Sequence, residues 1–354
     1  MKERIMDRAS AQAGPHSLPS SDAADASRPP VLYEAHGLIR DIPLQPHEMT
    51  AAVTATDKLF MLAHLGVLRI APEAWQLTVG GLVDRPLQLR LEDLARFLPA
   101  QIEAVHQCAG SPTAPTVATR RVACVVWGGV RLGDILREAG VQSGATHLWS
   151  DGADSGTFGG THVPYFRKDL PLARVDADVL LATRLNGDPL PNRHGGPVRL
   201  VVPGFYGTNS VKWLWRLTLA DRRADGLFTT LYYNDPLPDG TTRPVYGLEP
   251  ESIIVDPAPN TPVPRRAEIR GWAWGDAPVV EVKVSGDAGR TWVGAALGPR
   301  NGRAWQEWRC PWAFATAGPT MLICRATDAA GRMQPMDGAR NEVHRVIVEV
   351  SQER

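Results

Sequence analysis

The stretch VHQCAG, from Val105 to Gly110, constrains the fold of this chain more than any other segment. Residues 102–108 have the composition of a β-strand, and a period of two places His106 and Cys108 on the same face of it. A lone cysteine on a strand is most often a small buried apolar residue. The small residues after Cys108 nevertheless leave space beside the sulfur, where a thiolate can bind a soft metal.

A second block follows later in the chain, with HGGPVR from His194 to Arg199 and SVKW around Lys212. The Gly-Gly-Pro turn can aim His194 and Arg199 at one point. Arg199 lies in an apolar strand candidate, where a buried guanidinium needs an anionic partner. The glycine-containing turn 204–209 leaves backbone N–H groups accessible. Imidazole, guanidinium, ammonium and turn amides together predict a phosphate-binding pocket.

Composition limits the class of protein. The 354 residues include 38 basic and 38 acidic side chains, which gives no global attraction to nucleic acid or to an anionic membrane. The 33 glycines, 30 prolines and 11 tryptophans favour strands and turns. Four cysteines without a CxxC pair predict neither a disulfide framework nor a structural zinc site. Because no run reaches transmembrane length and residues 1–30 lack a signal-peptide core, we expect a cytoplasmic protein.

The chain divides into three parts. Residues 1–30 are polar and rich in Pro, Ser and Ala, which predicts a disordered tail. A first domain spans 31–250, and after a proline-rich linker a β-sandwich spans 255–354. Within these parts we expect strands at 75–83, 198–203, 267–273, 279–285, 321–327 and 343–350, and helices at 91–98 and 132–140.

These motifs resemble those of the sulfite oxidase family of molybdenum-cofactor enzymes. The family carries Cys-Ala-Gly, His-Gly-x-Pro-x-Arg, Val-Pro-Gly and Ser-Val-Lys-Trp, and this chain has all of them in order. Segments 127–132, 185–191, 271–274 and 285–292 also look like family segments, so the resemblance covers roughly 55–350. It implies an α+β fold, in which a mixed α/β molybdopterin-binding domain precedes an immunoglobulin-like β-sandwich. That second domain would form a homodimer.

The resemblance also implies the cofactors and the residues that hold them. Molybdenum and molybdopterin would be bound, with Cys108 as the metal ligand at which an oxo group is transferred to or from a small-molecule substrate. The residues implied around the pterin and its phosphate are His64, His194, Arg199, Gly207, Thr208, Asn209, Ser210 and Lys212. The sequence has no CxxCH motif and no cysteine cluster, so we expect electrons to pass to a separate electron-transfer partner.

Three departures from the family pattern concern the substrate. Leu62 replaces an arginine, residues 111–113 (Ser-Pro-Thr) replace Asn-Arg-Arg, and residues 233–236 end in proline where the family has a tyrosine. Sulfite is a small dianion that needs converging arginines, each charged hydrogen bond contributing about 1.5–3 kcal/mol. We therefore expect a substrate other than sulfite, in a pocket made more apolar by Leu62 and Phe205.

Several residues and functions remain open as alternatives. Arg120 and Arg121 could replace the missing arginines, and Arg121 is a candidate catalytic residue. Tyr206, Tyr232 and Tyr233 are donors that could replace the missing tyrosine, although packing is the ordinary role of a buried tyrosine. The rival functions are an S- or N-oxide reductase, a cofactor-binding protein without catalysis, and a metal-free enzyme with Cys108 as nucleophile and His106 as base.

Overall fold

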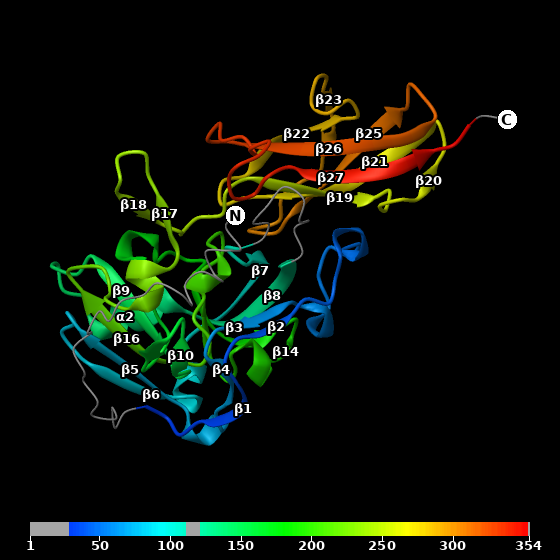
Figure 1. Ribbon diagram of the computed structural model, residues 1–354. Coiled ribbons are helices and arrows are strands. Elements are labelled where there is room, and N and C mark those ends of the chain that lie inside the picture. The colour runs from blue at the N-terminus through cyan, green and yellow to red at the C-terminus, as the bar shows by residue number, and fades with distance from the viewer. Residues whose placement is uncertain (1–27, 111–120, 353–354) are drawn as a thin grey trace.

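The computed structural model describes residues 28–110 and 121–352 (Figure 1). Strands dominate these residues, and α2 (Leu132–Ala139) is the one α-helix among them. The expectation of a mixed α/β first domain was wrong in this respect. The helix expected at 91–98 is the short 3₁₀-helix η4 (Glu92–Arg96), because β7 already begins at Pro99 and leaves no room for further turns.

Two main sheets form the first part of the chain, the lower half of the molecule in Figure 1. The five-stranded sheet has the order β12 (Arg167–Pro171), β9 (His147–Gly152), β16 (Leu214–Ala220), β5 (Gln76–Gly81) and β6 (Leu87–Arg90). The other sheet has the order β14 (Asp188–Pro189), β13 (Leu180–Leu185), β8 (Val122–Arg131) and β7 (Pro99–Gln107), with β15 (Arg199–Val201) also paired to β13.

Short elements connect these sheets and support their edges. Four two-stranded pairs are β1 (Leu32–His36) with β4 (Gly66–Arg69), β2 (Ile39–Asp41) with β3 (Met61–Ala63), β10 (Gly156–Phe158) with β11 (Thr161–Val163), and β17 (Asn234–Pro236) with β18 (Thr242–Pro244). The other short helices are η1 (Pro46–Glu48), η2 (Thr56–Lys58), η3 (Pro72–Ala74), η5 (Leu172–Arg174), η6 (Asn192–His194), η7 (Gly207–Asn209) and the π-helix η8 (Leu227–Leu231).

The last third of the chain forms two further sheets around an apolar core of their own, at the top of Figure 1. One sheet has the order β19 (Glu251–Asp256), β21 (Arg266–Trp274), β25 (Gln306–Ala313) and β24 (Ala296–Leu297). The other has the order β20 (Pro262–Val263), β27 (His344–Val350), β26 (Gly318–Asp328), β22 (Val279–Ser285) and β23 (Val293–Gly294).

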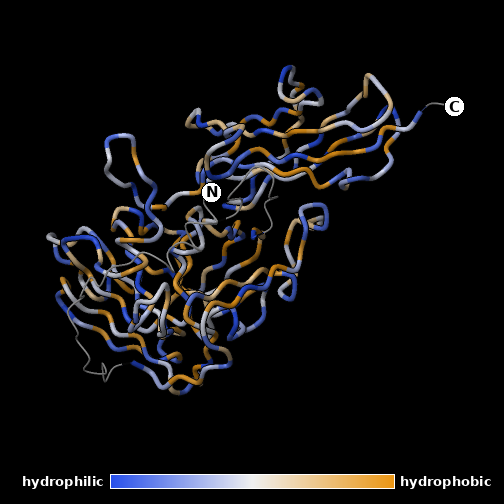
Figure 2. The backbone as a smooth tube through the Cα atoms, viewed as in Figure 1, coloured by the Kyte–Doolittle hydropathy of each residue, from blue (hydrophilic) through white to orange (hydrophobic). Residues whose placement is uncertain are grey.

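Hydrophobic patterning accounts for most of these elements. In β5 and β27, buried residues alternate with exposed or half-buried ones, as the sequence predicts for a strand with one face in the core. The expected helix at 132–140 is α2, and Gly140 ends it in the left-handed conformation with φ 69°. Figure 2 shows apolar residues along the interior strands and polar residues concentrated in the turns.

A shared apolar cluster joins the two parts of the chain. It contains Val105 and Ala109 beside the predicted thiol site, together with Trp272, Trp274 and Trp305 from the last third. Trp272 Nε1 donates to the carbonyl of Met49 at 2.6 Å, and Trp305 Nε1 donates to that of Ala52 at 2.8 Å. Trp274 Nε1 donates to Gln107 Oε1 at 2.9 Å, which is the side chain next to Cys108.

The described start of the chain is packed against the first domain. Pro29 is buried, and the guanidinium of Arg28 donates to the carbonyl of Ala153, so the last residues of the expected tail are ordered. Residues 1–27 and the segment 111–120, which includes Arg120 and the Ser-Pro-Thr departure, lie outside the described residues. All four cysteines are free thiols and buried. In the described part, no helix is both long and apolar enough to cross a membrane.

Candidate functional site

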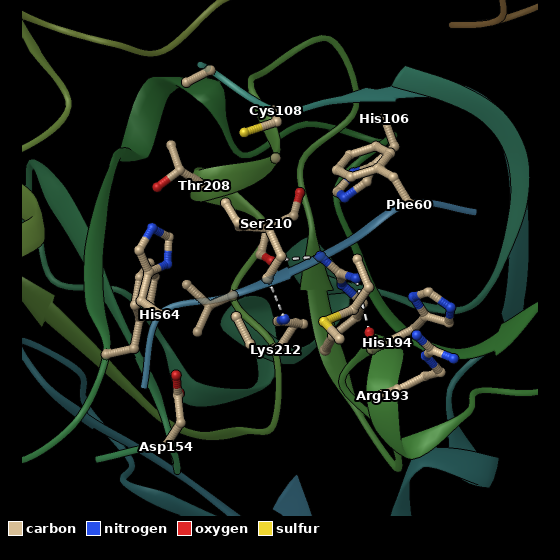
Figure 3. Close-up of a pocket in the computed structure, with 18 of the residues that line it drawn as sticks. Phe60, His64, His106, Cys108, Asp154, Arg193, His194, Thr208, Ser210 and Lys212 are labelled. Atoms are coloured by element: carbon tan, nitrogen blue, oxygen red, sulfur yellow. Dashed lines mark hydrogen bonds between the residues drawn. The ribbon is translucent and has the colours of Figure 1, made fainter. Parts of the chain in front are cut away.

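One pocket brings together residues from both sequence blocks (Figure 3). His106 reaches it from β7 and Cys108 from the position directly after β7. His194 comes from η6, Arg199 from β15 and Lys212 from the segment before β16. The lining residues are Phe60, Met61, Leu62, Ala63, His64, His106, Cys108, Ala109, Asp154, Phe166, Arg193, His194, Arg199, Gly207, Thr208, Ser210, Val211, Lys212 and Tyr233. The structure therefore brings the two motif blocks to one pocket.

Cys108 lies directly after the last residue of β7. Its backbone N–H donates to the carbonyl of Arg121 at 2.9 Å, which extends the pairing of β7 with β8 by one residue. The side chain is 7% exposed, so the thiol has a narrow opening to the pocket. Gly207 packs closely against this strand, since a Cβ there would lie 2.9 Å from the ring of His106 and 3.2 Å from the carbonyl of Gln107.

Arg199 is a buried guanidinium without a carboxylate partner in the part of the chain that the structure describes. Its Nη1 donates to the carbonyl of His194 at 2.8 Å, its Nη2 donates to that of Ser210 at 2.7 Å, and its Nε has no partner. The guanidinium also lies over the ring of Trp127 at 4.9 Å. Burial lowers the pKa of Arg199 to about 9, which indicates how costly this charge is without an anion.

Lys212 adds a second buried positive charge to the same pocket. Its ammonium donates to the carbonyl of Leu62 at 2.7 Å and lies 4.6 Å from the centre of the Trp213 ring. Burial, and then repulsion from Arg199, lowers its pKa to about 7. The same two causes, in the same order, lower the pKa of His194 to about 3. The pocket thus has a positive potential that a bound anion would neutralise.

The turn between Arg199 and Lys212 supplies polar groups around these cations. Ser210 Oγ accepts a hydrogen bond from the N–H of Val202 at 3.0 Å, which leaves its hydroxyl proton available. Asn209 is not among the lining residues; its amide nitrogen donates to two carbonyls, and its Oδ1 is buried without a partner. Gly195 has φ 102°, and a Cβ there would lie 2.7 Å from the side chain of Lys212. Only glycine therefore lets this turn approach the lysine.

His64 lies on another wall of the pocket, among aromatic rings. Its Nε2 is 2.7 Å from the hydroxyl of Tyr233, and its ring contacts those of Phe158, Phe166 and Phe228. Burial, followed by the charge of Lys212, lowers the pKa of His64 to about 3, so the imidazole is neutral at ordinary pH. A neutral imidazole can donate or accept one hydrogen bond to a heterocyclic ligand.

Three charged residues in or beside the pocket were missed by sequence reasoning. Asp154 is 4% exposed, and Figure 3 shows its carboxylate at the edge of the view opposite Cys108. Burial raises its pKa to about 6, although Lys212 and Arg28 oppose the shift. Arg193 lines the pocket beside His194. Arg340 comes from the loop before β27, where its guanidinium donates to the carbonyl of Ala109 and to Asp235. Arg193 could have been found as the neighbour of His194, whereas only the tertiary fold brings Asp154 and Arg340 to the site.

Other predicted residues have different positions. Arg121 is not among the pocket-lining residues, and its guanidinium donates to the carbonyl of Gly110. The expectation that Phe205 makes the pocket apolar was wrong, because its ring stacks on Tyr246 at 5.6 Å, away from the lining set. Leu62 does line the pocket. Tyr233 also lines it, whereas Tyr206 bonds to Asn341 at 2.9 Å in the shared apolar cluster.

The residues present fit a molybdenum–pterin cofactor. A thiol at one end suits a soft metal, while buried cations and a partnerless Arg199 Nε suit an anionic group. Among the described residues, no group of three or more His, Cys, Asp or Glu side chains could hold a metal ion. A metal beside Cys108 would therefore take its other ligands from a non-protein group, as the dithiolene of a pterin cofactor supplies them.

Comparison with known proteins identifies the family. Residues 64–228 match the model of the oxidoreductase molybdopterin binding domain, and residues 242–349 match that of the Mo-co oxidoreductase dimerisation domain. Sulfite oxidase of Gallus gallus is 32% identical over 325 residues, which cover 82% of this chain and 70% of that protein. Mitochondrial sulfite oxidase of Homo sapiens is 33% identical over 84% of this chain, and the match spans 62% of the human protein.

A solved structure agrees with these matches. The crystal structure of the sulfane dehydrogenase SoxCD from Paracoccus pantotrophus superposes with a TM-score of 0.76 at 25% identity, covering 97% of this chain and 95% of that one. The two family models match consecutive parts of the chain, a molybdopterin-binding domain followed by a dimerisation domain. The chain belongs to the sulfite oxidase family of molybdenum-cofactor-dependent oxidoreductases.

Proposed function

We propose that Cys108 is the protein ligand to molybdenum and that His194, Arg199 and Lys212 bind the phosphate of the pterin. The observation that carries this proposal is the pairing, in one pocket, of a scarcely exposed thiol with buried cations that have no carboxylate partner in the described chain. Gly207, Thr208, Asn209 and Ser210 supply the turn around the phosphate, and His64 contacts the pterin. The bound cofactor supplies the redox chemistry, while the protein orients it and excludes water.

The test is the molybdenum and pterin content of protein purified from a host that makes the cofactor. We expect about one molybdenum per chain in the wild type and a changed metal content or absorption spectrum in Cys108→Ser. Cys124→Ser is the matched control, because Cys124 is also a free buried thiol but does not line the pocket. A folded wild-type protein without molybdenum and pterin would overturn the proposal.

The pocket favours a substrate that is less anionic than sulfite. Leu62 contributes an apolar side chain where the family pattern has an arginine, and Phe60 and Phe166 add apolar surface. Among the described residues, the guanidinium groups of Arg121 and Arg340 donate to backbone carbonyls of the Cys108 loop. The similar SoxCD protein is a sulfane dehydrogenase by name. These observations support oxidation of a reduced sulfur group carried on a larger molecule.

Steady-state assays with an artificial electron acceptor test this substrate class. We expect turnover of a sulfane or organosulfur substrate with a higher kcat/KM than that of sulfite. Leu62→Arg alone is expected to leave sulfite oxidation weak, because a single guanidinium does not build a site for a dianion. Robust sulfite turnover by the wild type or by this variant would contradict the argument. An assay with a reduced dye and an S- or N-oxide tests the rival direction.

The match of residues 242–349 to a dimerisation domain also bears on how the chain assembles. We propose a first domain at 31–250 and an immunoglobulin-like domain at 255–354 through which two copies form a homodimer. The match of 242–349 to a dimerisation domain and the two-sheet arrangement support this assignment. A cytoplasmic location and a separate electron-transfer partner, without nucleic acid or membrane, belong to the same proposal. Sedimentation equilibrium of the full chain would contradict the homodimer if it gave the mass of one chain, 38.5 kDa.

A further inference from the structure

The residues 28–36 form a strap that lies against two separate walls of the cofactor pocket. Within this strap, β1 pairs antiparallel with β4, so that Tyr33 faces Leu68 and His36 faces Gly66 across the pair. Gly66 follows His64 by two residues. The strap thus contacts the turn that carries His64, on one side of the pocket.

The other contact of the strap is with the loop that carries Asp154. The hydroxyl of Tyr33 donates to the carbonyl of Ser155 at 2.8 Å and accepts from the backbone N–H of Ser155 at 2.7 Å. It is also 3.0 Å from Ser155 Oγ. The guanidinium of Arg28 donates to the carbonyl of Ala153 and, at 3.2 Å, to Ser155 Oγ. Both residues next to Asp154 are therefore held by the strap, while Asp154 itself faces the pocket.

Local geometry holds the strap in this position. Pro29 and Pro30 restrict the backbone before β1, and Pro29 is buried. The ring of Tyr33 stacks on that of His36 with centroids 4.4 Å apart. Gly66 has φ 124°, and a Cβ there would lie 2.4 Å from the carbonyl oxygen of Ala35, so β4 can accept the strap only with glycine at this position.

We propose that the strap 28–36 is a positioning element that retains the cofactor by holding the Asp154 loop and the His64 turn together. The inference rests on the proposed function, because it takes this pocket to be the cofactor site. The carboxylate of Asp154 and the imidazole of His64 can hydrogen-bond the N–H-bearing edge of a pterin. Because these two residues lie on segments that are far apart in the sequence, a third segment that contacts both can fix their relative position. Tyr33 and Arg28 act through Asp154 and do not themselves line the pocket.

The test measures how fast loaded protein releases pterin. Holoprotein is diluted, free pterin is separated at timed intervals and quantified by fluorescence, and activity is not needed. Tyr33→Phe removes the hydroxyl alone, and we expect release to become about tenfold faster. Arg28→Ala should act in the same direction, with Arg28→Lys as the milder variant. The controls are Tyr165→Phe and Arg85→Ala, which also remove hydrogen-bonding groups in the same domain, but whose hydrogen bonds in the described chain reach neither the strap nor residues 153–155.

A second readout uses the cofactor-free protein. Hydrogen exchange at the amide of Ser155 should accelerate in Tyr33→Phe, because that amide donates to the lost hydroxyl. Loaded wild type with unchanged release in Tyr33→Phe, Arg28→Ala and the double variant would overturn the strap inference alone. Wild type that carries no pterin would instead overturn the proposed function, and with it the strap's role in retention.

Discussion

Two charge clusters in the first part of the chain differ in whether their cations form ion pairs with a carboxylate. In the Asp151 cluster, the carboxylate of Asp151 is 1% exposed and accepts from both Arg167, at 2.6 Å, and Arg216, at 2.7 Å. In the cation pocket, Arg199 and Lys212 donate only to backbone carbonyls in the described chain, and Arg199 Nε has no partner. The first cluster is complete by itself, whereas the second is complete only with a ligand. Burial alone therefore does not reveal a binding site, but buried cations that form no ion pair in the described chain do indicate one.

The largest expected effect is on stability, in the Asp151 cluster. Asp151→Asn leaves two guanidinium groups without their carboxylate, and we expect the free energy of unfolding to fall by about 3–5 kcal/mol. Urea denaturation monitored by tryptophan fluorescence measures this loss. The pterin content of the chains that remain folded should not change. If Asp151→Asn lost cofactor but kept the wild-type free energy of unfolding, the two clusters would not have separate roles.

The reverse result is expected in the cation pocket. Lys212→Met removes a buried charge that has no carboxylate within ion-pair distance in the described chain, so the cofactor-free protein should gain about 1–3 kcal/mol. The same variant should carry less than a tenth of the wild-type pterin content, because it loses one charged hydrogen bond to the cofactor. Denaturation of the cofactor-free form and pterin analysis of the loaded form measure the two effects. Arg216→Met is the matched control, which should lose stability and keep the cofactor.

The charge of the Lys212 ammonium also makes the stability of the cofactor-free protein depend on pH. The pKa of Lys212 is about 7 in the folded protein, below its ordinary value of 10.5. Between these two values the unfolded chain binds more protons than the folded chain, so the stability of the cofactor-free protein should rise as pH increases from 7 towards 10. Denaturation midpoints across this range measure the slope. Lys212→Met should have a shallower slope, and an equal slope in both proteins would contradict the assignment.

The smallest expected effect is binding of inorganic phosphate. Phosphate supplies the anion that the cation pocket lacks, and at tens of millimolar it should stabilise the cofactor-free protein by about 1 kcal/mol. Thermal unfolding in phosphate and in sodium chloride of matched ionic strength separates binding from screening. Lys212→Met should show a much smaller gain. An equal gain in that variant would place the anion elsewhere.

Local patterns account for much of the fold but not for how the segments pack. The alternation in 279–285 and 343–350 predicted strands that the structure places at Val279–Ser285 and His344–Val350. The helix at 91–98 was predicted from apolar spacing and a following proline, but the segment is a 3₁₀-turn between two strands. The mixed α/β expectation, which the family resemblance implied, overestimated helix, and at 91–98 a pattern read over eight residues does not distinguish a helix from a compact turn.

Site residues that stand in sequence motifs could be predicted, whereas residues that only the tertiary fold brings to the site could not. His194, Arg199 and Lys212 stand in recognisable blocks, and the structure brings all three to one pocket with Cys108. Asp154 lies in the loop between β9 and β10, and Arg340 is 231 residues from the carbonyl that it contacts. Long-range contacts of this kind leave no local signal. The roles of the motif residues in cofactor binding stay predictions that the metal and pterin measurements above address.

The apolar cluster between the two parts of the chain has an evolutionary consequence. Trp274, in the last third, donates to the side chain of Gln107, immediately before Cys108. Recombination that replaced residues 242–349 by a foreign domain would leave Gln107 without this donor and expose the apolar face of Val105 and Ala109. Neither part can therefore be exchanged for an unrelated domain without disturbing the other. They must be inherited as a matched pair, and substitutions in one sheet constrain which substitutions the other can accept.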